Sequence, residues 1–169
     1  MTDITLRPAK TSDVEFILSL IGKYAPDRRM LRKEIITIYE DIQEFVIAEI
    51  SGQPVGYGAL HVLWEDLAEV RSVAVLPDLK RTGVGRAVVN HLLQRAKSLG
   101  IRRVFCLTFE VDFFASFGFL PTDGPIVDHD IYIQMLKSED EGVAEFLDLE
   151  RVKPNTLGNT RMLLVLPES

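Results

Sequence analysis

The chain has 169 residues, 47% of them hydrophobic, which is enough for one domain with a substantial core. Its formal net charge of −6 disfavours nucleic acid and anionic membranes as partners. No apolar run approaches the ~20 residues that cross a bilayer, and the N-terminal stretch MTDITLRPAK lacks the pattern of a signal peptide. We therefore expect a cytoplasmic protein.

Cysteine and histidine give no sign of a disulfide or a metal site. Cys106 is the single cysteine and lies in an apolar run, so we expect a packed thiol in a reducing compartment. His61, His91 and His129 lack the spacing of metal ligands, and neither HExxH nor CxxC occurs. We predict no metal.

The N-terminal part is predicted to contain a strand, two helices and a hairpin. Residues 4–8 form a short strand, and the capping-box pattern from Ser12 to Glu15 opens a helix that runs through Tyr24. A second helix is expected over residues 28–42. Its first turns carry Arg28, Arg29, Arg32 and Lys33, although cations are unfavourable at a helix N-terminus. These cations either serve a ligand or form a solvated basic face.

Two strands and a glycine pair follow. Residues 45–50 and 54–64 are predicted to form the two strands of a hairpin around Ser51-Gly52-Gln53. Gly56 and Gly58 in the second strand indicate a bulge or a close approach of another element to the sheet.

The next strand covers residues 67–75. Its alternation places Glu69, Arg71, Val73 and Val75 on one face of the sheet. Pro77 ends the strand, because proline cannot donate to a ladder.

A turn rich in glycine and basic residues then leads directly into a helix. Gly83 and Gly85 let the backbone turn tightly, and the first N–H groups of the helix are left unpaired. Lys80, Arg81 and Arg86 add positive potential, so the segment is typical of a phosphate site. A P-loop is excluded because no lysine follows Gly85, and a dinucleotide fingerprint lacks its third glycine.

The C-terminal half continues the alternation of helix and strand. The helix is predicted to end at Gly100, and residues 103–109 form an interior strand parallel to the preceding one. Short helices are expected within residues 110–119 and 128–136, and a last strand over 161–166. This order predicts an α/β domain with a mixed sheet.

The spacing Lys80-x-x-Gly83-x-Gly85 resembles the [Q/R]-x-x-G-x-[G/A] signature of GNAT acetyltransferases, with Lys80 where Gln or Arg is usual. The stretches GALHVLWEDLAEVRSVAVLP, RRVFCLTFE with FFASFGF, and EFLDLERVKPNTLGNTRMLLVL resemble short-form N-acetylglutamate synthase. The likeness covers nearly the whole chain. It implies a single GNAT-like domain over residues 1–169, without an amino-acid-kinase-like domain. It also implies a mixed central sheet with splayed parallel strands flanked by helices.

The resemblance implies acetyl-CoA as cosubstrate. The pantetheine arm would lie where the parallel strands splay, and the thioester carbonyl would accept a backbone N–H near Val73. The residues implied in binding acetyl-CoA are Val73, Val75, Lys80, Arg81, Thr82, Gly83, Val84, Gly85 and Arg86.

The chemistry requires a neutral amine that attacks a thioester, so a base must remove a proton from the ammonium group. Glu69 is the candidate base; the alternative is an exposed carboxylate at a strand end. Many GNAT enzymes use a tyrosine as acid, but this chain has Phe113 and Phe114 there. Thr108 is the candidate acid.

The resemblance implies L-glutamate as acceptor, whose two carboxylates need cations and amide donors. The candidate residues are Arg28, Arg29, Lys33, Arg71, Lys153, Asn155, Asn159 and Arg161. In a protein of charge −6, such a cationic pocket would be a local feature. Two alternatives stay open: a GNAT enzyme for another amine, and a non-catalytic acetyl-CoA-binding module. We also expect a homodimer.

Overall fold

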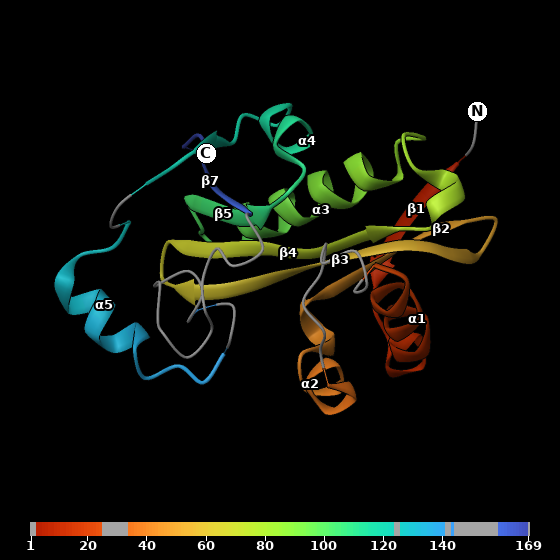
Figure 1. The fold of residues 1–169 in the computed structure, drawn as a ribbon, viewed down its shortest axis with the longest axis horizontal. Coiled ribbons are helices and arrows are strands. Elements are labelled where there is room, and N and C mark those ends of the chain that lie inside the picture. Colours follow the sequence, from red (N-terminus) through yellow and green to blue (C-terminus); the bar gives the residue numbers. More distant parts are fainter. Residues whose placement is uncertain (1–2, 25–33, 124–125, 141–142, 144–158, 169) are drawn as a thin grey trace.

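The computed structural model describes residues 3–24, 34–123, 126–140, 143 and 159–168. Within these residues the chain forms one seven-stranded sheet in the order β1-β2-β3-β4-β5-β7-β6, with helices on both faces (Figure 1). The elements are β1 (Ile4–Pro8), η1 (Thr11–Asp13), α1 (Val14–Tyr24), α2 (Ile35–Glu40), η3 (Ile42–Glu44), β2 (Phe45–Ile50), β3 (Gln53–Trp64), β4 (Leu67–Val75), η4 (Pro77–Leu79), α3 (Val84–Ser98), β5 (Arg103–Thr108), α4 (Val111–Ala115), β6 (Leu120–Pro121), α5 (His129–Met135) and β7 (Thr160–Val165).

The sheet is mixed, as predicted. Strands β1 to β4 pair antiparallel, β4 and β5 pair parallel, and β7 pairs antiparallel with both β5 and β6. The parallel pairing covers only the start of each strand, from Leu67 opposite Arg103 to Glu69 opposite Phe105. Beyond Glu69 the two strands have no paired residues, so the predicted splay is confirmed.

Two layers of helix cover the sheet (Figure 1). Helices α3 and α4 pack on one side, called here the α3 face, where Val88 and Leu92 meet Val70 and Val104 of the sheet. Helices α1, α2 and α5 lie on the opposite side, the α1 face. The apolar contacts on the α1 face form two separate clusters, one under α1 and α2 and the other beside α5.

Strand β4 does not keep one alternation along its length. Ser72 has a φ of 58°, and the register with β3 shifts from Ala59–Arg71 to Tyr57–Ala74. One extra residue therefore bulges out of β4 opposite Gly58, and the alternation is inverted after it. Val73 and Val75 pack on the α3 face, while Ala74 packs under α1.

The prediction that Glu69, Arg71, Val73 and Val75 share one face is therefore wrong. Glu69 and Arg71 have the same parity as Leu67, which packs beside α5 on the α1 face. The extra residue at the bulge moves the two valines to the α3 face.

Other differences lie at the ends of elements. Ser12 does not cap α1; instead the Asp13 carboxylate accepts the N–H of Lys10 at 2.7 Å and pairs with Arg7. Of the predicted second helix, α2 covers Ile35–Glu40, and residues 25–33 lie outside the described part. The two-residue strand β6 was not predicted, because its pairing with β7 depends on tertiary contact.

Gly58 is required by the close approach of α3 to β3. A Cβ on Gly58 would lie 2.6 Å from Val88 Cγ1, a distance that real Cβ atoms essentially never show, and 3.0 Å from Leu92 Cδ1, which is also tight. We expect Gly58→Ala to lower the free energy of unfolding by ~1–3 kcal/mol, measured by urea denaturation. The matched control is Gly22→Ala in α1, where a Cβ meets nothing within 4 Å and alanine favours helix. Equal stability of the two variants would contradict the proposed packing.

Candidate functional site

The turn between β4 and α3 folds the backbone around the start of a helix. Arg81 and Gly83, on either side of Thr82, have φ values of 64° and 96° in the left-handed region. The N–H of Ala87 donates to the Gly83 carbonyl at 3.0 Å. The N–H groups of residues 84–86 precede this first helical bond, so they face outward at the positive end of the helix. This is the geometry that the sequence predicts for a phosphate site.

Two basic side chains at this end are held in place by aromatic rings. Lys80 Nζ lies 4.8 Å from the ring centroid of Tyr24. The Arg86 guanidinium lies 4.8 Å from the Phe117 ring centroid, and its Nη2 donates to Ser116 Oγ at 2.8 Å. Both cations remain exposed, so they raise the local positive potential while their directions are fixed.

The opening between β4 and β5 exposes backbone beside this turn. Ser72 and Val73 have no partner residue in the described ladders with β3 or β5, because of the bulge and the splay. The Val75 carbonyl accepts a hydrogen bond from the Tyr24 hydroxyl at 2.6 Å. Backbone groups of Ser72 and Val73 therefore lie where an extended ligand could take the place of a strand.

Glu69 lies at the base of this opening, as the last residue of β4 that pairs with β5. It is 4% exposed, so it is a buried carboxylate and the alternative of an exposed strand end is wrong. Thr108 is also buried, and its Oγ1 accepts the N–H of Glu110 at 2.8 Å. The alternation of β5 places Thr108 on the α3 face with Val104, opposite to the face of Glu69.

Cys106 is a packed thiol, as predicted. It is buried in the core of the α3 face. Burial raises the pKa of the Cys106 thiol, and the nearby charge of Glu69 raises it further. The thiolate that a nucleophile requires is therefore disfavoured.

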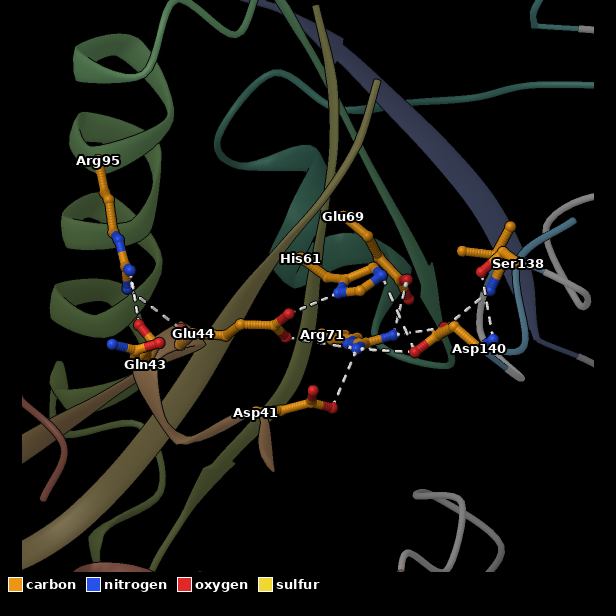
Figure 2. A network of polar contacts seen from close by, with 10 residues as sticks. Asp41, Gln43, Glu44, His61, Glu69, Arg71, Arg95, Ser138 and Asp140 are labelled. Carbon is orange, nitrogen blue, oxygen red and sulfur yellow. Dashed lines mark hydrogen bonds and ion pairs between the residues drawn. The ribbon is translucent and has the colours of Figure 1, made fainter. Parts of the chain in front are cut away.

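A cluster of charged side chains surrounds Arg71 on the α1 face (Figure 2). Arg71 Nη1 and Nη2 bind the two oxygens of Asp140 at 2.9 and 3.1 Å. Nη2 also donates to Glu44 Oε2 at 3.3 Å. Carboxylate oxygens of Asp41 and Glu69 each lie 3.7 Å from the guanidinium. We call these five residues and His61 the Arg71 cluster.

His61 joins the cluster from β3. Its Nδ1 lies 2.6 Å from Glu44 Oε1, and its Nε2 lies 3.8 Å from Asp140 Oδ2. The backbone at Glu44 is also fixed by α3, because Arg95 of that helix donates to the carbonyls of Gln43 and Glu44 at 2.6 and 3.3 Å (Figure 2).

Sequence reasoning missed Asp41, Glu44, His61 and Asp140. Asp41 and Glu44 come from one stretch between α2 and β2, whereas Asp140 follows α5 almost a hundred residues later, and no local pattern places them around one guanidinium. His61 could have been found from the β3–β4 hairpin, where it is the cross-strand partner of Glu69. The register is irregular between Val62 and Trp64, so counting residue pairs outward from the β3–β4 turn does not give His61 as the partner of Glu69.

The candidate acceptor residues are only partly described. Asn159 and Arg161 lie at the start of β7, where Arg161 pairs with Leu107 of β5. Arg71 lies beside Glu69, but carboxylates surround it, so its environment is acidic and not cationic as predicted. The remaining candidates, outside the described residues, are Arg28, Arg29, Lys33, Lys153 and Asn155.

Arg71 dominates the ionisation of Asp140. Burial by itself raises the pKa of the Asp140 carboxyl. The hydrogen bonds and the charge of Arg71, together with His61, outweigh burial and lower this pKa to about 2. The pKa of Arg71 is raised: burial opposes its charge, but Glu69, Asp140 and Glu44 more than compensate. Both groups are therefore charged near neutral pH.

Within the part of the chain that the structure describes, none of the helices combines the length and the apolar character needed to span a bilayer. In the same residues, no group of three or more His, Cys, Asp or Glu side chains has an arrangement that could hold a metal ion.

Comparison with known proteins gives one family and several relatives. Residues 15–119 match the model of the Acetyltransferase (GNAT) family. The amino-acid acetyltransferase of Mycobacterium tuberculosis is 52% identical over 164 residues, which cover 95% of this chain and 94% of that protein. An amino-acid acetyltransferase of Aeromonas salmonicida is 34% identical over 69% of this chain, which spans only 27% of that protein.

Solved structures with a similar fold include relatives of the same kind. The crystal structure of Rv2747 from Mycobacterium tuberculosis in complex with CoA and NLQ has a TM-score of 0.92 and 51% identity, covering 96% of this chain and 99% of its own. N-acetylglutamate synthase from Neisseria gonorrhoeae, complexed with coenzyme A and N-acetyl-glutamate, has a TM-score of 0.79 at 21% identity. It covers 99% of this chain and 36% of its own, and it supports the fold alone.

The lowered pKa of Asp140 predicts a pH-dependent contribution to stability. The folded-state pKa of about 2 lies below the ordinary value of 3.8. The ion pair therefore stabilises the fold above about pH 4, and this contribution is lost as the pH falls towards 2. At pH 7 we expect Asp140→Asn to lower the free energy of unfolding by at most about 2 kcal/mol. Denaturation at pH 7 and pH 3 measures the difference from wild type, which should shrink at pH 3. A difference that is constant with pH would contradict this account.

Proposed function

The chain belongs to the GNAT acetyltransferase family, and we propose that it forms N-acetyl-L-glutamate and CoA from acetyl-CoA and L-glutamate. It is an acyltransferase, and its amino-acid acetyltransferase relatives support transfer from acetyl-CoA to an amino acid. The observation that carries the proposal is the opening between β4 and β5. It joins the turn at the start of α3, the backbone of Ser72 and Val73, which has no partner residue in the ladders, and the buried Glu69.

Acetyl-CoA would bind along this opening. The pyrophosphate would meet the first N–H groups of α3 together with Arg81 and Arg86, because a helix N-terminus stabilises anions. The pantetheine arm would take the place of a missing strand beside Val73 and Val75. The thioester carbonyl would then accept the N–H of Val73, which stabilises the charge that develops on its oxygen during attack.

Glu69 would act as the base. The acceptor arrives mostly as an ammonium ion, and the loss of one proton gives the amine lone pair that attacks the thioester carbonyl. Glu69 lies at the base of the opening, and its carboxylate is 3.7 Å from Arg71 Nη1. Thr108 would protonate the leaving thiolate. Its hydroxyl oxygen already accepts the N–H of Glu110, which leaves its own hydrogen available to donate.

The glutamate carboxylates would be bound by the cations predicted on the acceptor side, with Arg161 and Arg71 among the described residues. The acidic surroundings of Arg71 favour a second candidate function, acetylation of a cationic amine such as a polyamine. The resemblance to N-acetylglutamate synthase, carried by segments around both Glu69 and Arg161, favours glutamate over this alternative.

With glutamate as acceptor, the reaction would be the first step of arginine biosynthesis. We place it in the cytoplasm, a reducing compartment, because the single cysteine, Cys106, has no second cysteine with which to form an internal disulfide. A homodimer and a single GNAT domain over residues 1–169 are parts of the same proposal.

An acceptor panel tests the proposal. Purified protein is mixed with acetyl-CoA and one of glutamate, glutamine, aspartate, arginine or spermidine, and the released CoA thiol is followed. We expect kcat/KM to be highest with glutamate. A preference for spermidine would support the cationic-amine alternative. Tight binding of acetyl-CoA without turnover on any acceptor would indicate a binding module and contradict an enzyme.

Replacement of the proposed base gives a sharper test. We expect Glu69→Gln to lower kcat with glutamate by ~10²–10⁴-fold, because the isosteric amide cannot accept the ammonium proton. The dissociation constant of acetyl-CoA, measured by calorimetry, should stay the same. The matched control is Glu65→Gln in the exposed β3–β4 turn, which should retain wild-type turnover. Near-normal turnover of Glu69→Gln would remove Glu69 as the base.

A further inference from the structure

We propose that His61, held by Glu44, relays to solvent the proton that Glu69 takes from the acceptor amine. This inference rests on the proposed function, because it takes Glu69 as the base. It assigns a role in the reaction to two residues, His61 and Glu44, that the sequence did not indicate.

The need for a relay follows from the burial of Glu69. With 4% of its surface exposed, Glu69 has little direct contact with bulk water. Each turnover delivers one proton to this carboxylate, and the proton must leave before the next acceptor can be deprotonated. A neighbouring group that both exchanges protons near neutral pH and reaches solvent would satisfy this need.

His61 is placed next to Glu69 by the sheet. The two residues are direct cross-strand partners of β3 and β4, so their Cβ atoms are expected ~4.5–5.5 Å apart on the same face. Figure 2 shows both side chains directed into the Arg71 cluster. A proton can therefore pass from the Glu69 carboxyl to the imidazole directly or through one water.

Glu44 fixes the form of the imidazole that can accept a proton. Its carboxylate oxygen lies 2.6 Å from His61 Nδ1, and an ionised carboxylate only accepts, so Nδ1 carries the hydrogen. Nε2 then keeps its lone pair as the proton acceptor. The carboxylate also stabilises the imidazolium that forms, as an aspartate does behind the histidine of a catalytic triad.

The imidazole also reaches solvent. The side chains of His61 and Glu44 are 18% and 24% exposed, against 5% for Glu69. A surface pocket of about 360 Å³ lies beside His61 and is lined further by Trp64, Gln134, Lys137 and Ser138. His61 thus lies between a buried carboxylate and a space that water can enter.

Charges on every packed element affect the relay. The charged groups around the imidazole are the carboxylates of Glu44 from η3, Asp140 after α5 and Glu69 from β4, and the guanidinium of Arg71 from β4. Asp140 Oδ2 is 3.8 Å from Nε2, too far for a direct hydrogen bond, so it does not block the lone pair.

The proton steps balance. The ammonium gives one proton to Glu69, and the neutral amine forms the C–N bond with the thioester carbon. The C–S bond then breaks, and the CoA thiolate takes a second proton from the nitrogen, by way of the acid. The Glu69 proton moves to His61 Nε2 and from there to pocket water, so each turnover releases amide, thiol and one proton.

The test compares His61→Gln with wild type across pH. We expect kcat/KM for the acceptor to fall ~10–100-fold at pH 7. The deficit should shrink at higher pH, where more acceptor amine is already neutral and needs no proton removal. KM for acetyl-CoA should be unchanged, and imidazole added to His61→Ala should restore part of the rate. Glu44→Gln should show a smaller loss with the same pH trend.

The matched control is His129→Gln at the exposed start of α5, which should behave as wild type. Circular dichroism checks that each variant is folded. Wild-type kcat/KM for His61→Gln at all pH values would overturn the relay. A deficit that is independent of pH and not rescued by imidazole would overturn it too, because a purely structural role predicts that result. Absence of turnover in the wild type itself would instead contradict the proposed function, and the relay with it.

Discussion

Strand β4 carries one more residue than its partner β3 between Arg71 and Ala74, and the arrangement of the whole site depends on it. The extra residue inverts the alternation, so Glu69 and Arg71 lie on the α1 face while Val73 and Val75 lie on the α3 face. The same bulge frees backbone at Ser72 and Val73, just where β4 leaves β5. Gly58 allows α3 to pack closely against β3 at this height. The backbone of Ser72 and Val73, which no β-ladder pairs, and the buried carboxylate of Glu69 thus lie close together on one strand.

Burial and charge divide the site into two electrostatic regions. Around the start of α3, exposed Lys80, Arg81 and Arg86 and the helix dipole produce a positive potential suited to phosphates. On the α1 face, one guanidinium is surrounded by four carboxylates, which keep it charged and fix its position. Removal of Arg71 would leave these carboxylates without their shared cation, so Arg71 holds the α1 face together whatever else it binds. His61, Glu44, Asp41 and Asp140 are the partly exposed members of that region, whereas Glu69 and Arg71 are buried within it.

The sequence predicts much of this architecture because the relevant signals are local. Each of these patterns predicts the conformation of its own segment. Gly83 and Gly100 mark the two ends of α3, the apolar periodicity between them predicts the helix, and the continuous apolar run predicts β5. The glycine-rich turn before α3 is local as well, since its outward N–H groups and its cations lie within seven consecutive residues, 80–86. The acidic surroundings of Arg71 were not predicted, because the segment with Asp41 and Glu44 and the distant segment with Asp140 reach it only in the folded chain.

By itself, therefore, the sequence determined the α/β class, the glycine-rich turn that leads into α3 and the presence of a glutamate on the strand before it. Only the tertiary structure decided which face that glutamate occupies and what surrounds it. A period of two predicts the faces of a strand only while the ladder is regular, and a single inserted residue at Ser72 inverts every later position. Whether such a residue bulges depends on the partner strand and on the helix packed against it, and these contacts exist only in the folded chain.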